Sequence, residues 1–208
     1  GERHKLLFCG VFSLQGEKTM RIQITLLISI FTLFSINCSA QKTSAENINK
    51  IATLDKARAA HTATLLKDGN VLIVGGVQQN EVFYDEAEVF DPRTNSFTTL
   101  KNKMTKKRVS HTATLLNDGR VLIVGGWSNR GILENSAEVY NPTTRNFVAI
   151  EQMKFKRSGH SSTLLENGKV LIAGGHDGNK SHSEAELFNP KTNSFEPTGK
   201  MQIARKIH

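Results

Sequence analysis

The segment His61-Thr-Ala-Thr-Leu-Leu-Lys-Asp-Gly-Asn-Val-Leu-Ile-Val-Gly-Gly76 occurs three times in the chain with small changes. It returns as His111-Thr-Ala-Thr-Leu-Leu-Asn-Asp-Gly-Arg-Val-Leu-Ile-Val-Gly-Gly126 and as His160-Ser-Ser-Thr-Leu-Leu-Glu-Asn-Gly-Lys-Val-Leu-Ile-Ala-Gly-Gly175. Self-similarity at a period of about 50 residues is typical of proteins built from repeated structural units. The structure of one unit can therefore be predicted first and then repeated along the chain.

A second motif follows each copy of the first. Its three versions are Ala87-Glu88-Val-Phe-Asp-Pro92, Ala137-Glu138-Val-Tyr-Asn-Pro142 and Ala185-Glu186-Leu-Phe-Asn-Pro190. Each is followed by a phenylalanine and then a methionine, at Phe97 and Met104, Phe147 and Met153, and Phe195 and Met201. One unit thus combines two conserved phrases with a variable stretch between them.

Each unit predicts four antiparallel strands. Two short β-branched runs flank Asp68-Gly69, Asp118-Gly119 or Asn167-Gly168, dipeptides that favour a tight type I′ hairpin turn. The third strand carries the Ala-Glu motif and should end before proline, which lacks an N–H and fixes φ. The fourth strand holds the phenylalanine. No sustained helical period occurs from Gln41 to His208, so the sequence predicts an all-β fold.

These phrases resemble the kelch family, in particular its bacterial secreted members, over roughly residues 54–208. The resemblance implies kelch-type β-propeller blades, each a four-stranded antiparallel unit, packed around an axis. One departure is the aromatic residue of the fourth strand, which the family usually has as Trp. Phe97, Phe147 and Phe195 stand there in this chain, and we expect the change to affect only the packing between blades.

The repeats divide the chain into three complete units and the start of a fourth. Their approximate bounds are 54–103, 104–152, 153–200 and 201–208. A propeller closes with at least about four blades, so we expect the native chain to continue past His208. The segment 41–53 is a candidate outer closing strand.

Residues 20–40 have the features of a secretory signal peptide. Met20-Arg21 begins a short basic start, Ile24 to Ile36 is almost unbroken apolar sequence, and Cys38-Ser39-Ala40 offers small residues before a cut at Gln41. The apolar run is shorter than the roughly 20 residues of a transmembrane helix, so no stable membrane anchor is expected. Residues 1–19 are interpreted as lying upstream of the true start. We therefore expect export to the periplasm, the cell surface or the medium.

Lipidation of Cys38 is a less favoured alternative for the mature N-terminus. Phe34-Ser-Ile-Asn37 lacks the Leu and small residue that usually precede a lipidated cysteine. The other cysteine, Cys9, also lies before Gln41. The predicted mature chain therefore has no thiol for a disulfide, a metal site or nucleophilic catalysis.

The pattern Arg-x-x-His occurs once per unit, and we interpret it as structural. A feature present in every blade suits a contact between blades better than catalysis, which needs an asymmetric site. The arginines are expected to pair with the repeated glutamates, while the double glycines allow close backbone packing rather than phosphate binding. The residues assigned to this repeat framework are Arg58, His61, Gly75, Gly76, Glu88, Arg108, His111, Gly125, Gly126, Glu138, Arg157, His160, Gly174, Gly175 and Glu186, with Arg205 and His208 beginning a fourth copy.

The variable stretches between strands two and three are the candidate binding loops. In an antiparallel blade these loops leave at the same end as the linkers between blades, and variation on a repeated scaffold is typical of binding surfaces. The residues predicted to bind ligand are Phe83, Tyr84, Trp127, Arg130, His176 and Lys180.

Charge suggests what such loops could bind. The chain carries a formal charge of +8, and the linkers at the loop end contain Lys101, Lys103, Lys106, Lys107, Lys154 and Lys156. Aromatic residues among cations suit an anionic glycan or the acidic surface of a protein. The alternative, that the lysines are solvated surface and Trp127 is a packing residue, is equally supported. Nucleic acid fits the charge but not an exported address.

Chemistry beyond binding has little support in the sequence. His176, Asp177 and His182 could suggest a metal, but Asp177-Gly178 is better explained as a turn, and no metal or cofactor is expected. The function predicted is an exported, noncatalytic scaffold that recognises a protein or a carbohydrate. The alternative, implied by resemblance to some secreted kelch propellers, is a carbohydrate-active enzyme such as a sialate-mutarotase-like epimerase. No catalytic residue could be assigned for it.

Overall fold

A computed structural model describes residues 52–79, 81–129 and 131–207, which all fall within one of the chain's two units, Lys50–His208. The described residues form strands, turns and loops, with no helix among them. In particular, they contain no helix long and apolar enough to cross a bilayer. The segments 1–19, 20–40 and nearly all of 41–53 lie outside the described residues, and Ala52 and Thr53 belong to no strand.

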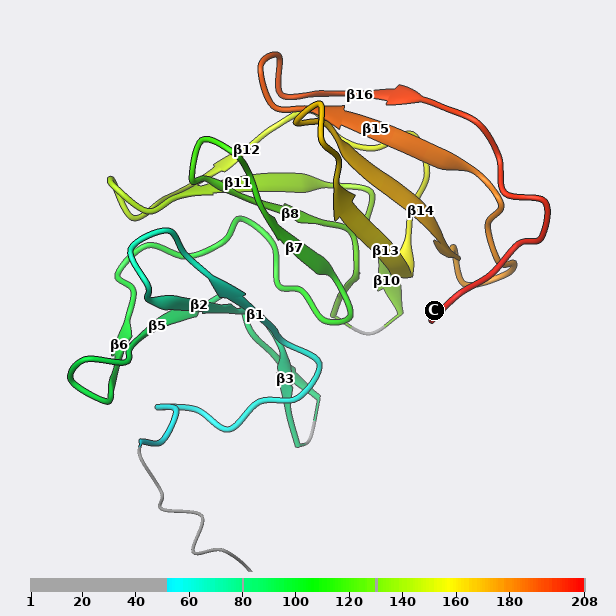
Figure 1. Cartoon of the computed structure of the whole chain (residues 1–208). Coiled ribbons are helices and arrows are strands. Elements are labelled where there is room, and N and C mark those ends of the chain that lie inside the picture. Colours follow the sequence, from blue (N-terminus) through cyan, green and yellow to red (C-terminus); the bar gives the residue numbers. More distant parts are fainter. Residues whose placement is uncertain (1–51, 80, 130, 208) are drawn as a thin grey trace, which may run out of the picture. The chain divides into compact units, whose positions relative to one another are not determined.

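The strands form three antiparallel four-stranded sheets, which we call blades 1 to 3 (Figure 1). Blade 1 consists of β1 (Thr62–Leu65), β2 (Val71–Val74), β5 (Ala87–Asp91) and β6 (Ser96–Thr99). Blade 2 consists of β7 (Thr112–Leu115), β8 (Val121–Val124), β11 (Ala137–Asn141) and β12 (Asn146–Ala149). Blade 3 consists of β13 (Ser158–Leu164), β14 (Val170–His176), β15 (Ala185–Asn189) and β16 (Ser194–Pro197). The four-stranded units predicted from the repeat are confirmed.

The turn between the first two strands of each blade differs from the prediction. A type I′ turn needs positive φ at both central residues, yet of Asp68 and Gly69 only Gly69 has it, at 86°. The amide of Leu66 donates to the carbonyl of Asn70, and that of Gly69 to Leu66. This is a three-residue loop with a glycine in the left-handed region, so the type I′ prediction is wrong in this blade, and in the other two for the same reason.

The third and fourth strands follow the sequence closely. β5, β11 and β15 each end at the residue before proline, because proline cannot continue the ladder. The fourth-strand phenylalanine lies opposite an aromatic residue of the third strand. Their ring centroids are 4.9 Å apart for Phe90 and Phe97, and the pairs of the other blades are similarly spaced.

The hydrophobic core lies between successive blades. Because strand side chains alternate between faces, Val121 and Ile123 of β8 join a cluster with Leu72 and Val74 of blade 1. Leu122 and Val124 of the same strand join the cluster with blade 3, which also contains Val170 and Ile172. All four residues of β8 are therefore buried. The repeated Met104 and Met153 fill these two interfaces.

A row of backbone hydrogen bonds also joins the blades. The amide of Ser110 donates to the carbonyl of Ala60, that of Gly159 to Ser110, and that of Ile207 to Gly159. All four residues have φ between 51° and 61°, the left-handed region that residues with a side chain rarely adopt. Equivalent positions of successive repeats thus touch through their main chains, and the first strands β1, β7 and β13 lie side by side along this row (Figure 1).

Candidate functional site

The loops between the second and third strands lie at one end of the blades, which we call the loop face. In blade 1 the loop forms a small hairpin of β3 (Val77–Gln78) and β4 (Val82–Phe83), and in blade 2 one of β9 (Trp127–Ser128) and β10 (Ile132–Leu133). Blade 3 has only a bridge between His176 and Ser181. Bridges from Ala59 to Val77 and from Val109 to Trp127 place the linkers at the same end.

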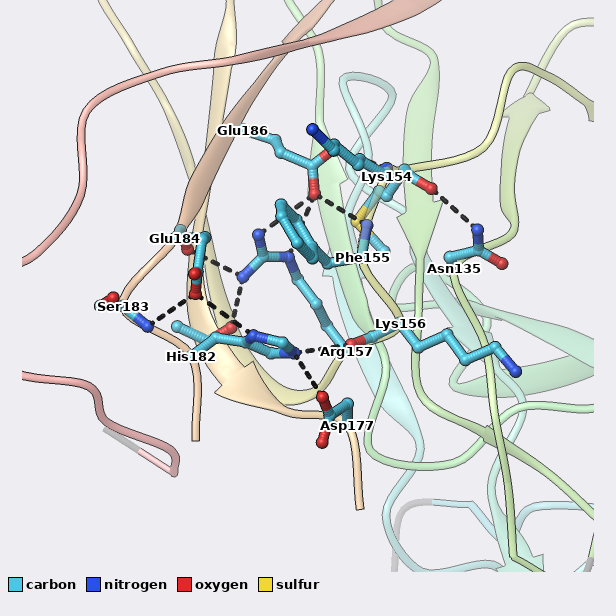
Figure 2. A network of polar contacts seen from close by, with 12 residues as sticks. Asn135, Lys154, Phe155, Lys156, Arg157, Asp177, His182, Ser183, Glu184 and Glu186 are labelled. Carbon is cyan, nitrogen blue, oxygen red and sulfur yellow. Dashed lines mark hydrogen bonds and ion pairs between the residues drawn. The ribbon is translucent and has the colours of Figure 1, made fainter. Parts of the chain in front are cut away.

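The repeated arginine binds a buried carboxylate within its own blade. Figure 2 shows the third copy, in which Arg157 reaches Glu186 at 3.1 Å, and Arg108 reaches Glu138 at 3.0 Å. Both arginines are fully buried. Burial lowers the pKa of the Arg157 guanidinium, and the charges of Glu186 and Glu184 oppose that shift.

The main chain of the same arginine hydrogen-bonds to the preceding blade. The carbonyl of Arg108 accepts from Gly76, and its amide donates to Tyr84, both in blade 1. Its guanidinium donates to the carbonyl oxygens of Gly125 and Ser136 in blade 2. Arg157 joins blades 2 and 3 in the same manner. This residue is a joint between blades, and its side chain is not available to a ligand.

The double glycines make this joint possible. A Cβ added at Gly75 would lie 2.4 Å from the carbonyl oxygen of Arg108 and 2.8 Å from His111 Cε1. At Gly125 it would lie 2.6 Å from the Arg157 oxygen and 2.8 Å from His160 Cε1. Real Cβ atoms do not approach other atoms so closely. The absence of a side chain at these glycines therefore lets the linker of the next blade pack against them.

The histidines of the repeat also lie between blades. His111 Nε2 is 3.0 Å from Thr62 Oγ1, and His160 Nε2 is 2.9 Å from Thr112 Oγ1. Burial, assisted by the charge of Arg108, lowers the pKa of His111 to about 3. His111 is therefore neutral at ordinary pH. With the arginines and glycines, these side chains occupy the contacts between blades.

Each loop contains a polar pair of side chains, and the residue types of this pair differ from blade to blade. The Tyr84 hydroxyl donates to Gln78, and the Ser128 hydroxyl donates to Glu134. In blade 3, His182 Nε2 lies 3.7 Å from Asp177 and its Nδ1 lies 3.4 Å from Glu184 (Figure 2). These pairs stabilise the loops from within.

Each of these inner residues also meets a matching residue of the incoming linker. Lys56 lies over the ring of Tyr84 at 5.3 Å, and Phe155 contacts the ring of His182 at 5.6 Å. Burial acts to raise the pKa of Glu134, but hydrogen bonds from Ser128 and Ser136 and the charges of Lys106 and Arg108 outweigh it, so that pKa is lowered. The loops vary together with the linkers that they contact.

A groove opens on the loop face between the hairpins of blades 1 and 2, and we call it the loop-face groove. Its volume is about 510 Å³. Hairpin residues form its walls, and residues near the backbone row, Ala60 and Ser110, also line it. The described lining residues are Ala60, Val77, Glu81, Phe83, Val109, Ser110, Trp127, Asn129 and Gly131.

Between blades 2 and 3 the loops contact each other directly. The rings of Trp127 and His176 are 5.6 Å apart, and a Cβ at Gly178 would lie 3.0 Å from Leu133. Burial and the charge of Lys206 lower the pKa of His176, which favours the neutral ring. The contacts between neighbouring loops therefore differ between the two blade interfaces.

The six predicted ligand residues lie in different environments in the structure. Phe83 and Trp127 line the groove together, and His176 supports Trp127. Tyr84 is only 4% exposed and contacts the linker. Lys180 is exposed and hydrogen-bonds through its backbone to Asp177, away from the groove lining. Arg130 lies outside the described residues.

Seven of the nine described groove residues were not singled out from the sequence, among them Glu81, Asn129, Ala60 and Ser110. Glu81 and Asn129 lie in the variable loops, and that variability was the signal that could have found them. Ala60 and Ser110 lie inside the repeated Arg-x-x-His motif. Ala60 and Ser110 lie beside the groove because their backbone has positive φ, a conformation that neither Ala nor Ser predicts in a sequence.

The lysines of the linkers do not line this groove. Lys103 lies 3.1 Å from Glu86, which Lys56 also contacts at 2.8 Å, and the Lys154 ammonium lies over Phe155. Among the described lining residues of the groove, Glu81 alone is ionisable. In the described part of the chain, no group of three or more His, Cys, Asp or Glu is placed to hold a metal ion.

Comparison with known proteins places the fold. The family model described as the KLHDC2/KLHL20/DRC7 Kelch-repeats domain matches residues 28–208. The solved structure titled "Structure of YjhT" aligns with a TM-score of 0.61 and 13% sequence identity, covering 70% of this chain and 53% of that one. This chain thus spans about half the length of that protein, and identity so low shows a shared fold alone. No curated protein sequence matches the chain.

Proposed function

The chain belongs to the kelch-repeat family, and on that premise we propose that it is an exported binding protein. Its blades would act as a scaffold, and its loop face would recognise a protein or a carbohydrate. Propellers serve many unrelated activities, so the function has to be argued from the site and not from the fold.

The observation that carries this proposal is the asymmetry of the loop face. Repeated residues serve the contacts between blades, as Arg108 and His111 illustrate. The loop-face groove departs from the repeat, because Phe83 and Trp127 line it between blades 1 and 2, whereas between blades 2 and 3 the ring centroid of His176 lies 5.6 Å from that of Trp127. Small-molecule sites are usually concave, largely apolar and provided with a few polar groups, and this groove has that composition.

Binding through the loop face can be tested by comparing two single substitutions on immobilised glycan and peptide arrays. Trp127→Ala removes a wall of the groove. Lys191→Ala changes an exposed residue in the turn after β15, at the opposite end of the blade. We expect Trp127→Ala to lose signals that Lys191→Ala retains. Equal signals from both variants and the wild-type chain would place the ligand elsewhere.

Export is tested separately, because residues 20–40 lie outside the described residues. Deleting this segment should leave the protein in the cytoplasm of a bacterial host, whereas the full chain should reach the periplasm or the medium and begin at Gln41. Retention of the full chain in the cytoplasm would contradict the proposed export. A mature protein that begins at a lipidated Cys38 would replace simple secretion with a lipid anchor.

A further inference from the structure

We propose that Asn179 is a site of asparagine-linked glycosylation, at which an oligosaccharide is attached to the side-chain nitrogen Nδ2. This modification is separate from ligand binding at the loop face. It rests on the proposed export, because bacteria present the lipid-linked oligosaccharide donor on the outer side of the membrane. The proposal follows from the sequence Asp177-Gly-Asn-Lys-Ser181 and from the place of that sequence in the fold.

The sequence around Asn179 has the pattern of an acceptor site. Asn179-Lys-Ser181 matches Asn-x-Ser/Thr with a residue other than proline in the middle. After the predicted cut at Gln41, no other asparagine of the sequence has this pattern, since Asn141 has proline in the middle of its Asn-Pro-Thr. Asp177 lies two positions before Asn179, where acceptor sites of bacterial oligosaccharyltransferases carry an acidic residue. The segment therefore matches the longer bacterial form of the motif.

The acceptor asparagine lies at the exposed tip of the blade 3 loop. The bridge between His176 and Ser181 closes this loop, and the amide of Asp177 donates to the carbonyl of Lys180 at 3.2 Å. The residues in between form a tight turn, and residues 178–180 are exposed. An oligosaccharide is bulky and polar and is attached at the surface of a protein. The tip of this turn meets that requirement.

Asp177 shapes the turn and carries a charge. Its Oδ1 accepts from the backbone amides of Lys180 and Asn179, both at 3.0 Å, an arrangement typical of an Asx turn. These hydrogen bonds lower the pKa of Asp177, so its carboxylate is ionised at neutral pH. Its Oδ2 lies 3.7 Å from His182 Nε2 (Figure 2), and its side chain is 27% exposed. A cationic side chain of the enzyme can therefore pair with this carboxylate.

The transfer needs one co-substrate, an oligosaccharide that is held through its anomeric carbon on a lipid diphosphate. The bond from that carbon to the phosphate oxygen breaks, and a bond from the same carbon to Nδ2 of Asn179 forms. The carboxamide loses one proton, and the lipid diphosphate leaves. No oxidant or reductant takes part. The hydroxyl of Ser181 belongs to the recognised motif and is not consumed.

The test uses the purified full chain from cells without the enzyme, a purified bacterial oligosaccharyltransferase that reads the acidic motif, and a lipid-linked oligosaccharide of known mass. Intact mass spectrometry should show one added oligosaccharide. Tandem mass spectrometry of the peptide covering residues 170–180 should place it on Asn179. The same measurements are made on the chain recovered from the periplasm of cells that contain this enzyme and donor. We expect the modification in both experiments.

Four variants define the site. Asn179→Gln removes the acceptor and Ser181→Ala removes the hydroxyl, so both should lose the added mass completely. Ser181→Thr is the matched control, because threonine also fits the motif, and it should be modified as the wild type is. Asp177→Asn keeps an oxygen for the two backbone hydrogen bonds but removes the charge. It should slow the modification about tenfold, the loss expected for one charge-assisted hydrogen bond.

Two outcomes would overturn the proposal. One is an unmodified Asn179 in a reaction mixture that modifies a reference peptide. The other is an added mass that persists in Asn179→Gln, which would place the oligosaccharide on a different residue. Modification in the reaction mixture but not in cells, with the chain held in the cytoplasm, would support the acceptor site and contradict the proposed export. Equal rates for Asp177→Asn and the wild type would contradict the role of the Asp177 charge.

Discussion

At the scale of single residues, the repeat places polar groups where an apolar core would otherwise lie. His111 is almost completely buried between blades 1 and 2, with one ring nitrogen bonded to Thr62. Its other ring nitrogen, Nδ1, is buried without a hydrogen-bond partner among the described residues. Gly125 is located where any side chain would collide with the next blade. The identities of these residues are therefore set by contact between blades.

Titration of His111 should make the fold sensitive to acid. Its pKa is lowered from 6.5 to about 3 in the folded chain, so the unfolded chain binds the proton more tightly. This contribution is fully present above about pH 6.5 and is lost, at about 1.4 kcal/mol per pH unit, as the pH falls towards 3. Denaturant unfolding of the wild type and His111→Gln across this range measures it.

Carboxylates titrate in the same range, but they affect both proteins alike. The stability advantage of the wild type over His111→Gln should therefore shrink steadily below about pH 6.5. An advantage that stays constant down to pH 4 would mean that the burial of His111 does not govern its titration.

Two glycine substitutions separate backbone conformation from crowding. Gly119 and Gly125 both have positive φ, at 89° and 64°, but a Cβ at Gly119 meets only Lys67 Cδ at 3.5 Å. Gly119→Ala should cost about 1 kcal/mol of unfolding free energy. Gly125→Ala should cost about 2–5 kcal/mol, because it also forces the Arg157 carbonyl away. Thermal unfolding of the two variants distinguishes them, and equal losses would contradict the close packing at Gly125.

At the scale of elements, each linker belongs to two blades. The main chain of Arg108 bonds to blade 1 and its side chain to blade 2, where both oxygens of Glu138 are used. One carboxylate oxygen accepts the amide of Thr105 and the other accepts the guanidinium of Arg108. An ion pair buried in this way contributes little net stability when intact, but it is costly to break.

Removing one partner of this pair should therefore be severe. Arg108→Ala is expected to lose about 3–5 kcal/mol of unfolding free energy, since Glu138 stays buried without its counter-charge. Arg93→Ala breaks an exposed pair with Asp91 and should change stability by less than about 1 kcal/mol. Urea unfolding at neutral pH compares them. If Arg108→Ala fails to fold, Arg108→Met with Glu138→Leu should restore a folded chain. Equal, small losses of unfolding free energy in Arg108→Ala and Arg93→Ala would contradict a structural role for the Arg-x-x-His motif.

The elements were largely predictable from the sequence because their signals are local. Proline at Pro92 marks the end of β5, and short runs of apolar, β-branched residues mark β2 and β8. The turn type was not predictable from the Asp68-Gly69 dipeptide, because the same residues fit a three-residue loop with one left-handed glycine. The small hairpins of the loops were also missed, since their strands have two residues each.

At the scale of the whole molecule, a repeated framework carries a surface that is not repeated. The interface clusters and the arginine joints recur from blade to blade, while the loops differ. The groove arises where Phe83 and Trp127, 44 positions apart in the chain, line a shared space. Sequence reasoning could select variable loops, but whether neighbouring loops leave a groove or close it depends on packing between blades.

Binding at the loop face is tested most directly by hydrogen–deuterium exchange of the full chain with and without a bound ligand from the arrays. We predict slower exchange in the hairpins that contain Phe83 and Trp127, with no change in the turns 67–70, 117–120 and 167–169 at the opposite end. Protection confined to those turns, with the two hairpins unaffected, would contradict the assignment of the loop face as the binding surface.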